Sequence, residues 1–442
     1  MEKICISPLD DRYLKYTKSI KNYFSEFAFF RYRILVEIEY FITLLELNLK
    51  GYDRLNDDII CSIKNIFFDF CFDDYIKIKN IEKKIKHDVK SIEYFLIEKF
   101  TNIGIKSYTP LIHFGLTSQD VNNTAIGISL KTFIFDKYIF HFNNIVDNLL
   151  ENKINEWEGI VMLSRTHGQP AVPTTLSKEF RVFCYRLHLQ YEILLDTKFY
   201  GKFGGASGNL NAHKIAYPSI DWIEFGNVFI QRFGLIRSKF TTQIDNYDNI
   251  AVLFDCLKRI NNILIDMCQD IWLYISFDYL KQLIVPGEVG SSTMPHKINP
   301  INFENAEGNL KLANSLLEFF SRKLPISRLQ RDLTDSTVLR NLGVIFGHIF
   351  VAFNNIEIGL SKLDVNREKI QEDLDDNYVV IAEGIQTILR KYGHLDAYEK
   401  MKALTRSNSK ITKTDIDLFI NNLIVNDEIK DELRNLNVKT YI

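Results

Sequence analysis

The segment at residues 286–300, PGEVGSSTMPHKINP, carries the side chains best suited to chemistry in this chain of 442 residues. Ser291, Ser292 and Thr293 supply hydroxyl groups and backbone N–H groups in a glycine-flanked loop, and Lys297 supplies a fixed positive charge. Such a group can hold a carboxylate and stabilise the negative charge that forms when the adjacent carbon loses a proton. An ordinary surface loop before a helix has a similar composition, because Ser and Thr are common helix caps. We expect a helix to begin near Pro300.

Long helices must position this loop, because only 9 Pro and 20 Gly interrupt the sequence. From Phe254 to Ile275 apolar residues recur at spacings of three and four, which predicts one long amphipathic helix. Similar windows cover roughly residues 22–48, 121–155, 175–199, 305–322 and 338–362, and alternating strand patterns are nearly absent. The sequence therefore predicts an all-α protein with a long central helical bundle.

Composition and charge exclude several classes of partner. The chain is 46% hydrophobic, and its net charge is only -2, with 54 basic and 56 acidic residues. No field of either sign dominates, so nucleic acid and an anionic membrane are not expected as partners. The N-terminus has no apolar signal region, and the longest uncharged stretch, residues 342–356, is too short to span a bilayer. Six cysteines without a C-x-x-C pair are typical of buried free thiols in a reducing, cytoplasmic setting.

Motifs for metals and nucleotide cofactors are missing from the sequence. There is no H-E-x-x-H motif and no Cys/His cluster, so we expect no metal. The glycine-rich segment at residues 201–208, GKFGGASG, lacks the spacing of a Walker loop and of a Rossmann loop. We therefore expect no cofactor.

The string GSSTMPHKINP at residues 290–300 resembles the G-S-S-x-M-P-x-K-x-N-P loop of the fumarase/aspartase superfamily. Members cleave a C–N or C–O bond by β-elimination and release fumarate, or carry out related chemistry. The resemblance implies a three-domain helical chain. We place the boundaries near 107, where the sequence breaks at residues 102–110, and near 362, before a charged tail of shorter helices. The expected domains are an N-terminal domain at 1–107, a central bundle domain at 108–362 and a C-terminal domain at 363–442. It also implies a homotetramer whose active sites draw residues from three subunits.

Further strings are similar to the bacterial-type adenylosuccinate lyase family within that superfamily. They are SPLDDRY at 7–13, HDVKSIEYF at 87–95, LSRTHGQPA at 163–171, TTQI at 241–244, RDLTDSTVLRNLG at 331–343 and YEKMKALTR at 398–406. The resemblance implies release of fumarate from adenylosuccinate and from the succinyl-aminoimidazole carboxamide ribotide (SAICAR) in purine biosynthesis. The chain departs from the family pattern at Asp11, at residues 84–86 and at Gly384.

This elimination needs an acid, a base and a stabilised intermediate. A proton must leave the carbon next to a carboxylate, and the departing nitrogen must be protonated. By resemblance His167 is the general acid, and imidazole can hold a proton near neutral pH. Glu304 matches the acidic residue that orients and charges this ring. Ser291 matches the general base, and Lys297 and the loop N–H groups are candidates for lowering the pKa of its hydroxyl.

The resemblance also implies a set of substrate-binding residues. Those for phosphate and ribose are Arg12, Tyr13, Lys86, His87 and Asp88. Those for the succinyl end and its neighbours are Thr117, Ser118, Gln243, Ser292, Lys297, Ile298, Asn299 and Asn305. Those for the nucleotide monophosphate are Arg331, Ser336, Thr337, Val338, Leu339 and Arg340, where arginine gives a bidentate grip.

Other interpretations remain open at this stage. His113 and His213 lie near the matched strings but have no assigned role. Argininosuccinate lyase, aspartase and fumarase share the Ser291 loop, although they do not need the basic set for a nucleotide phosphate. A non-catalytic structural protein on the same scaffold is a different class, and the presence of His167, Ser291, Lys297 and Glu304 argues against it.

Overall fold

The computed structural model describes residues 5–284, 287, 294, 296–406 and 411–442. The chain divides into two compact units: residues 1–142, 190–262 and 308–354 form the first, and 143–189, 263–307 and 355–442 form the second. Ser291 and Ser292 lie outside the described residues. The predicted boundaries near residues 107 and 362 remain predictions.

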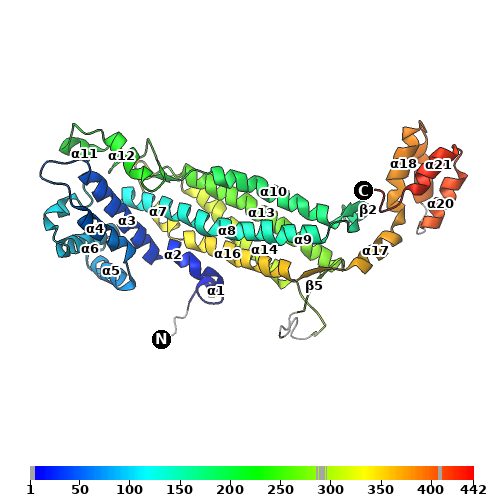
Figure 1. Cartoon of the computed structure of the whole chain (residues 1–442), viewed down its shortest axis with the longest axis horizontal. Coiled ribbons are helices and arrows are strands. Elements are labelled where there is room, and N and C mark those ends of the chain that lie inside the picture. The colour runs from blue at the N-terminus through cyan, green and yellow to red at the C-terminus, as the bar shows by residue number, and fades with distance from the viewer. Residues whose placement is uncertain (1–4, 285–286, 288–293, 295, 407–410) are drawn as a thin grey trace. The chain divides into compact units, whose positions relative to one another are not determined.

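The first unit begins with a group of short and medium helices (Figure 1, blue to cyan). These are η1 (Pro8–Asp10), α1 (Leu14–Thr17), η2 (Lys18–Ile20), α2 (Lys21–Phe24), α3 (Glu26–Leu45), α4 (Asp57–Phe68), α5 (Phe72–Ile85), α6 (Asp88–Asn102) and η3 (Lys106–Leu111). Helix α3 starts at the Ser25 cap, whose hydroxyl accepts a hydrogen bond from the Ala28 N–H at 3.1 Å. Fourteen of its residues are buried, so α3 is the central helix of this group.

A continuous helical run follows over residues 118–156. It consists of α7 (Ser118–Phe133), the π-helix η4 (Ile134–Tyr138), α8 (Ile139–Asn143), the π-helix η5 (Asn144–Leu150) and α9 (Glu151–Glu156). Other long helices are α10 (Leu176–Asp196), α13 (Asp248–Ser276), α14 (Ile301–Lys323) and α16 (Leu342–Ser361). Each of the predicted helical windows holds one of these elements or α3, and α14 begins one residue after Pro300. The prediction of an all-α fold is confirmed.

Aromatic side chains fix the long helices to the N-terminal group within the first unit. The Phe24 ring lies 4.8 Å from the Phe346 ring and 4.9 Å from the Phe133 ring. All three rings belong to different helices (α2, α7 and α16), and Phe133 and Phe346 are fully buried. Such pairs add about 0.5–1.5 kcal/mol each beyond the area they bury.

The second unit contains a β-hairpin that was not predicted from the sequence. Strands β1 (Val161–Thr166) and β2 (Gln169–Thr175) pair antiparallel, with Thr166 opposite Gln169. A two-residue turn of His167 (φ 53°) and Gly168 (φ 75°) joins them, and positive φ at both positions is typical of a type I′ turn. The pattern was not recognised because Pro170 and Pro173 interrupt the alternation of polar and apolar residues.

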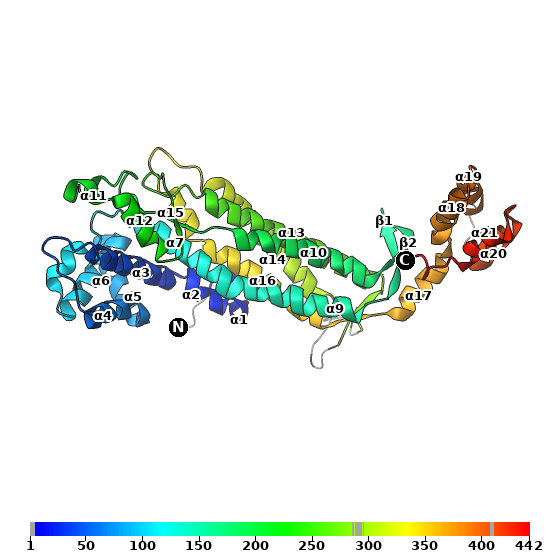
Figure 2. The ribbon, with the colours of Figure 1, turned by 45° about the horizontal axis from the view of Figure 1, so that its top comes forward.

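The remaining elements are short. In the first unit they are β3 (Tyr200–Gly201), α11 (Asn211–Ala216), α12 (Trp222–Gln231), β4 (Ile236–Arg237) and α15 (Thr334–Leu339). In the second unit they are β5 (Leu280–Gln282), β6 (Leu363–Val365), α17 (Arg367–Asp376), η6 (Tyr378–Ile381), α18 (Ala382–Lys391), α19 (Ala397–Thr405), α20 (Lys413–Asn422) and α21 (Asp427–Asn435). Helices α18, α20 and α21 pack together as a small group (Figure 2, orange to red).

Among the residues that the structure describes, one helical stretch, residues 334–361, is long and apolar enough to cross a membrane by composition. More than half of its most apolar window, 56%, is buried inside the protein, which is typical of a core helix. The cysteines agree only in part with the prediction of buried thiols. Cys184, Cys256 and Cys268 are buried, but Cys61 and Cys71 are exposed because they lie on solvent-facing positions around α4 and α5.

Candidate functional site

The predicted general acid lies at the tip of the β1–β2 hairpin. His167 is exposed and occupies the left-handed region, which non-glycine residues seldom adopt. Within the described parts of the chain, its imidazole has no hydrogen-bond partner. The hairpin therefore presents the ring to its surroundings rather than packing it into a core.

The predicted partner of His167, Glu304, lies in the first turn of α14. Its carboxylate Oε1 accepts a hydrogen bond from Trp272 Nε1 at 3.0 Å. Among the residues that the structure describes, no contact joins Glu304 to His167. Lys297 and Ile298 are exposed and Asn299 and Asn305 are half-buried, and they lie just before and within α14.

Three of the predicted binding residues meet in the first unit. Arg331 Nη1 donates to Gln243 Oε1 at 3.2 Å, and Nη2 donates to Ser336 Oγ at 3.4 Å. The Gln243 backbone N–H also donates to the Gln330 carbonyl at 3.2 Å. The Arg331 Nε is buried and has no hydrogen-bond partner in the described structure. The guanidinium is thus held on two sides and keeps donor capacity for a ligand.

A second cluster surrounds Asp88, at the first position of α6. Its Oδ2 lies 2.8 Å from Arg33 Nη2 and 3.9 Å from Arg340 Nη2. Burial acts to raise the pKa of Asp88, but the charges of Arg33 and Arg340 and the Val89 N–H outweigh it and lower that pKa. Asp88 therefore remains a carboxylate between two guanidinium groups.

Sequence reasoning missed Arg33, whose guanidinium lies 3.8 Å from the Phe29 ring centroid and is almost completely buried. The available signal was an arginine among mostly apolar and aromatic residues of α3, since a charge that the fold buries needs a partner. Arg33, Asp88, Ser336 and Arg340 line one cavity of about 310 Å³. This volume lies at the lower end of the range for small-molecule sites, about 300–1,000 Å³.

A separate pocket of about 300 Å³ brings together His87, Thr117 and Ser118 with His113. His87 caps α6, and its Nδ1 accepts a hydrogen bond from the Lys90 N–H at 3.1 Å. Its Nε2 is therefore the ring nitrogen that can donate in the neutral imidazole. No role was assigned to His113 from the sequence, and the structure places it in one pocket with three predicted binding residues.

The glycine-rich segment has a structural function that the sequence did not show. Its backbone N–H groups at Gly204 and Gly205 donate to the Asp120 carboxylate at 2.9 and 3.0 Å. The Lys202 ammonium, which is completely buried, lies 2.7 Å from the same carboxylate. Asp120 in turn accepts from the Thr117 N–H at 2.9 Å and so caps α7. The segment thus binds a carboxylate of the protein itself, next to Thr117 and Ser118.

We expect Lys202→Met to lower the free energy of unfolding by about 3–5 kcal/mol, because it leaves a buried carboxylate without its cation. Urea titration followed by circular dichroism measures the loss. Lys198→Met is the matched control, since Lys198 is exposed in the irregular segment just before β3 and its loss should cost less than about 0.5 kcal/mol. Equal stability of the two variants would contradict the structural role of Lys202.

The remaining predicted binding residues of the first unit differ in exposure and conformation. Arg12 is exposed and its guanidinium lies 6.0 Å from the Tyr13 ring centroid. Lys86 ends α5 in the left-handed conformation, with φ 58°. In α15 and at its end, Thr337 and Arg340 are exposed, whereas Val338 and Leu339 are buried. Leu339 nevertheless lines the cavity of about 310 Å³ together with Arg340.

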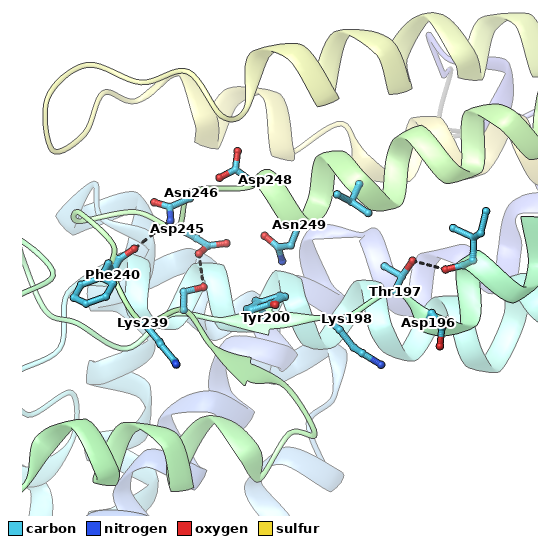
Figure 3. Close-up of a pocket in the computed structure, with 13 residues that line it drawn as sticks. Asp196, Thr197, Lys198, Tyr200, Lys239, Phe240, Asp245, Asn246, Asp248 and Asn249 are labelled. Atoms are coloured by element: carbon cyan, nitrogen blue, oxygen red, sulfur yellow. Dashed lines mark hydrogen bonds between the residues drawn. The ribbon is translucent and has the colours of Figure 1, made fainter.

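Another hollow of the first unit has none of the predicted residues in its lining. It has a volume of about 790 Å³ and lies between the end of α10 and the start of α13. Figure 3 shows two of its polar groups bonded to the protein: Asp245 accepts from Ser238 at 2.6 Å, and Asn246 donates to the Phe240 carbonyl at 3.1 Å. Exposed apolar side chains, Val252 and Phe240 among them, also line it.

Comparisons with known proteins identify the family of this chain. Residues 15–314 match a family model described as Lyase, and residues 327–442 match one described as Adenylosuccinate lyase C-terminal. An adenylosuccinate lyase of Dictyostelium discoideum is 50% identical over 99% of this chain and 96% of its own length. One from Escherichia coli K12 is 42% identical over the same shares of the two chains.

Solved structures show the same fold at low identity. The 3-carboxy-cis,cis-muconate lactonizing enzyme of Pseudomonas putida has a TM-score of 0.76 at 17% identity, covering 96% of this chain and 93% of its own. The fumarate lyase of Mesorhizobium sp. BNC1 has a TM-score of 0.75 at 15% identity, covering 96% and 95%. From the matched family models and the full-length relatives, the chain belongs to the adenylosuccinate lyase family of the fumarase/aspartase superfamily.

Proposed function

We propose that this enzyme eliminates fumarate from adenylosuccinate, giving AMP, and from SAICAR, giving the free carboxamide ribotide AICAR. It would thereby serve both AMP and IMP biosynthesis. The observation that carries the proposal is the 42–50% identity to adenylosuccinate lyases over 99% of the chain. The guanidinium groups of Arg331 and Arg340 add physical support, because a phosphate-bearing substrate needs such donors.

In the proposed mechanism Ser291 removes a proton from the carbon next to a succinyl carboxylate. Lys297 and loop N–H groups stabilise the charge that develops there, and they also lower the pKa of the Ser291 hydroxyl. His167 then donates a proton to the departing nitrogen, and Glu304 orients and charges the imidazole. The exposed position of His167 on a hairpin tip suits a group that must reach a substrate.

Binding divides between two sets of residues. Arg331, Ser336 and Arg340 would hold the phosphate, with Arg12, Tyr13, Lys86, His87 and Asp88 around the phosphate and ribose. Thr117 and Ser118 would hold a succinyl carboxylate, with Gln243, Ser292, Lys297, Asn299 and Asn305 near the succinyl end. The pocket that contains His87, Thr117 and Ser118 supports a shared anion site. Ile298, Thr337, Val338 and Leu339 complete the proposed set.

The proposed assembly is a homotetramer with shared active sites, working in the cytoplasm. Helix α10 exposes Val182, Tyr185, Leu189 and Ile193 to between 41% and 66%, and their spacing places them on one face of the helix. Helix α14 likewise exposes Leu312 and Phe319, one heptad apart, to 55% and 50%. Apolar stripes of this kind are typical of surfaces covered by another subunit.

We expect turnover of both nucleotides, followed by absorbance with EDTA present throughout. EDTA tests the prediction that no metal is needed, and fumarate is measured separately to confirm the products. Argininosuccinate, aspartate and malate serve as comparison substrates. Activity on one of these, and on neither nucleotide, would refute the proposal, and inactivity on all of them would favour a structural protein on this scaffold.

A further inference from the structure

A fully buried carboxylate holds one side of the His113 ring. Glu37, on α3, is about 1% exposed, and its Oε1 lies 2.5 Å from His113 Nδ1. Its second oxygen, Oε2, has no hydrogen-bond partner in the described structure. A buried carboxylate is costly unless a charged or donating group compensates it, and His113 is that group.

This contact decides how the ring is used. Because Nδ1 donates to Glu37, Nε2 is the nitrogen left for another partner. Nε2 lies 4.0 Å from Glu93 Oε1, beyond hydrogen-bond distance, and Lys90 already holds the other oxygen of Glu93 at 2.6 Å. The ring lines the pocket that also contains Thr117 and Ser118.

The backbone around His113 is held in an unfavourable conformation. His113 has a φ of 56°, in the left-handed region that costs a non-glycine residue about 1–2 kcal/mol. Helix α3 fixes this loop at a second point, since Tyr40 Oη donates to the Phe114 carbonyl at 2.6 Å. An unfavourable backbone conformation that surrounding contacts hold in place often marks a functional position.

We propose that Glu37 is a positioning residue, which holds His113 so that Nε2–H donates to an oxyanion of the substrate in the pocket formed with Thr117 and Ser118. The oxyanion belongs either to a succinyl carboxylate or to the nucleotide phosphate. The inference rests on the proposed function, and it adds a residue that acts on the substrate only through His113.

Charge at His113 follows from the same geometry. Burial acts to lower the pKa of His113, but Glu37, then Glu93 and Asp120, outweigh it and raise that pKa above its usual value. Lys90 and His87 also face this pocket, and the positive charge of Lys90 acts in the opposite direction. The ring therefore stays a cation at pH values where an ordinary histidine loses its proton.

The test is Glu37→Gln in the full-length enzyme, which keeps the shape and removes the charge. The pKa of His113 should fall, so that near pH 8 the ring is neutral and its Nε2 has no proton to donate. We expect KM for adenylosuccinate to rise about tenfold or more at pH 8, the loss for one charge-assisted hydrogen bond, with a much smaller change at pH 6. The kcat should change less than KM, because the contact would exist in the ground state as well.

Glu39→Gln is the matched control. Glu39 lies on the same helix and faces Arg232 at 3.5 Å, and we expect its KM to follow the parent at both pH values. A double-mutant cycle with His113→Asn adds a second criterion. If Glu37 acts through His113, then Glu37→Gln should have no further effect on KM once His113 has been replaced.

Product inhibition identifies the oxyanion. A weaker inhibition by fumarate alone would assign it to the carboxylate, and a weaker inhibition by AMP alone would assign it to the phosphate. Parental KM and parental inhibition by both products in a folded Glu37→Gln variant would overturn the inference, while parental turnover leaves the proposed function intact. If the parent itself turned over neither nucleotide, the proposed function would fail. Calorimetric binding of fumarate and AMP to Glu37→Gln and Glu39→Gln would then still test whether Glu37 positions His113.

Discussion

His167→Ala and Ser291→Ala are each expected to lower kcat by about 10²–10⁴-fold, the contribution typical of general acid or base catalysis. Both variants should fold, since His167 lies exposed on a hairpin tip and neither residue is assigned to phosphate binding. Stopped-flow and steady-state absorbance measure the loss, and KM should change little. A double variant should be only slightly worse than either single variant, because residues acting in one step are not additive.

The two losses should differ in kind. Ser291→Ala should abolish exchange of the substrate methylene proton with deuterated solvent, provided the parent shows such exchange by NMR. His167→Ala should retain that exchange while nitrogen departure is blocked. Turnover of Ser291→Ala at the parental rate would show that the base lies elsewhere, and His87 would be the next residue to replace.

The helices of this fold were predictable because their patterns are local. Apolar spacing of three and four marked α13 along most of its length, and Pro300 marked the start of α14. The β1–β2 hairpin was not predicted, because its turn depends on positive φ at His167, which the residue type does not reveal. A search for two-residue turns that end in glycine would have found His167-Gly168.

Individual site residues were predictable from short sequence motifs, but the contacts between them were not. Gln243, Arg331 and Ser336 were predicted from separate strings, and the structure brings them into contact. Arg33 and Lys202 were missed because their significance lies in partners 55 and 82 positions away in the chain. Burial of a charge creates the need for such a partner, and burial is a property of the fold rather than of a local pattern.

Gly384, where the chain departs from the family pattern, is another residue whose role depends on a distant partner. A Cβ atom at this position would lie 2.4 Å from the Tyr441 ring, and Tyr441 Oη donates to Glu383 at 2.9 Å. The small residue therefore leaves room for a ring 57 positions further along the chain. Nothing in the sequence around residue 384 indicates which side chain occupies that space.

The second large effect concerns assembly. An equal mixture of inactive His167→Ala and Ser291→Ala chains, refolded together, should recover about one quarter of the parental activity, because the proposed site takes its histidine from one subunit and its serine from another. The apolar stripe on α10 supports subunit contact, and within the described residues His167 has no partner in its own chain.

The measurement compares the mixture with each variant refolded alone, and native mass spectrometry establishes that hybrid tetramers have formed. Each variant alone keeps one type of defect in all four sites, so neither control should regain activity. If histidine and serine served one site from the same subunit, random mixing would restore no site at all. Hybrid tetramers without activity, or fully active monomers in light scattering, would therefore refute a shared site, whereas recovery near one quarter requires that each site crosses a subunit boundary.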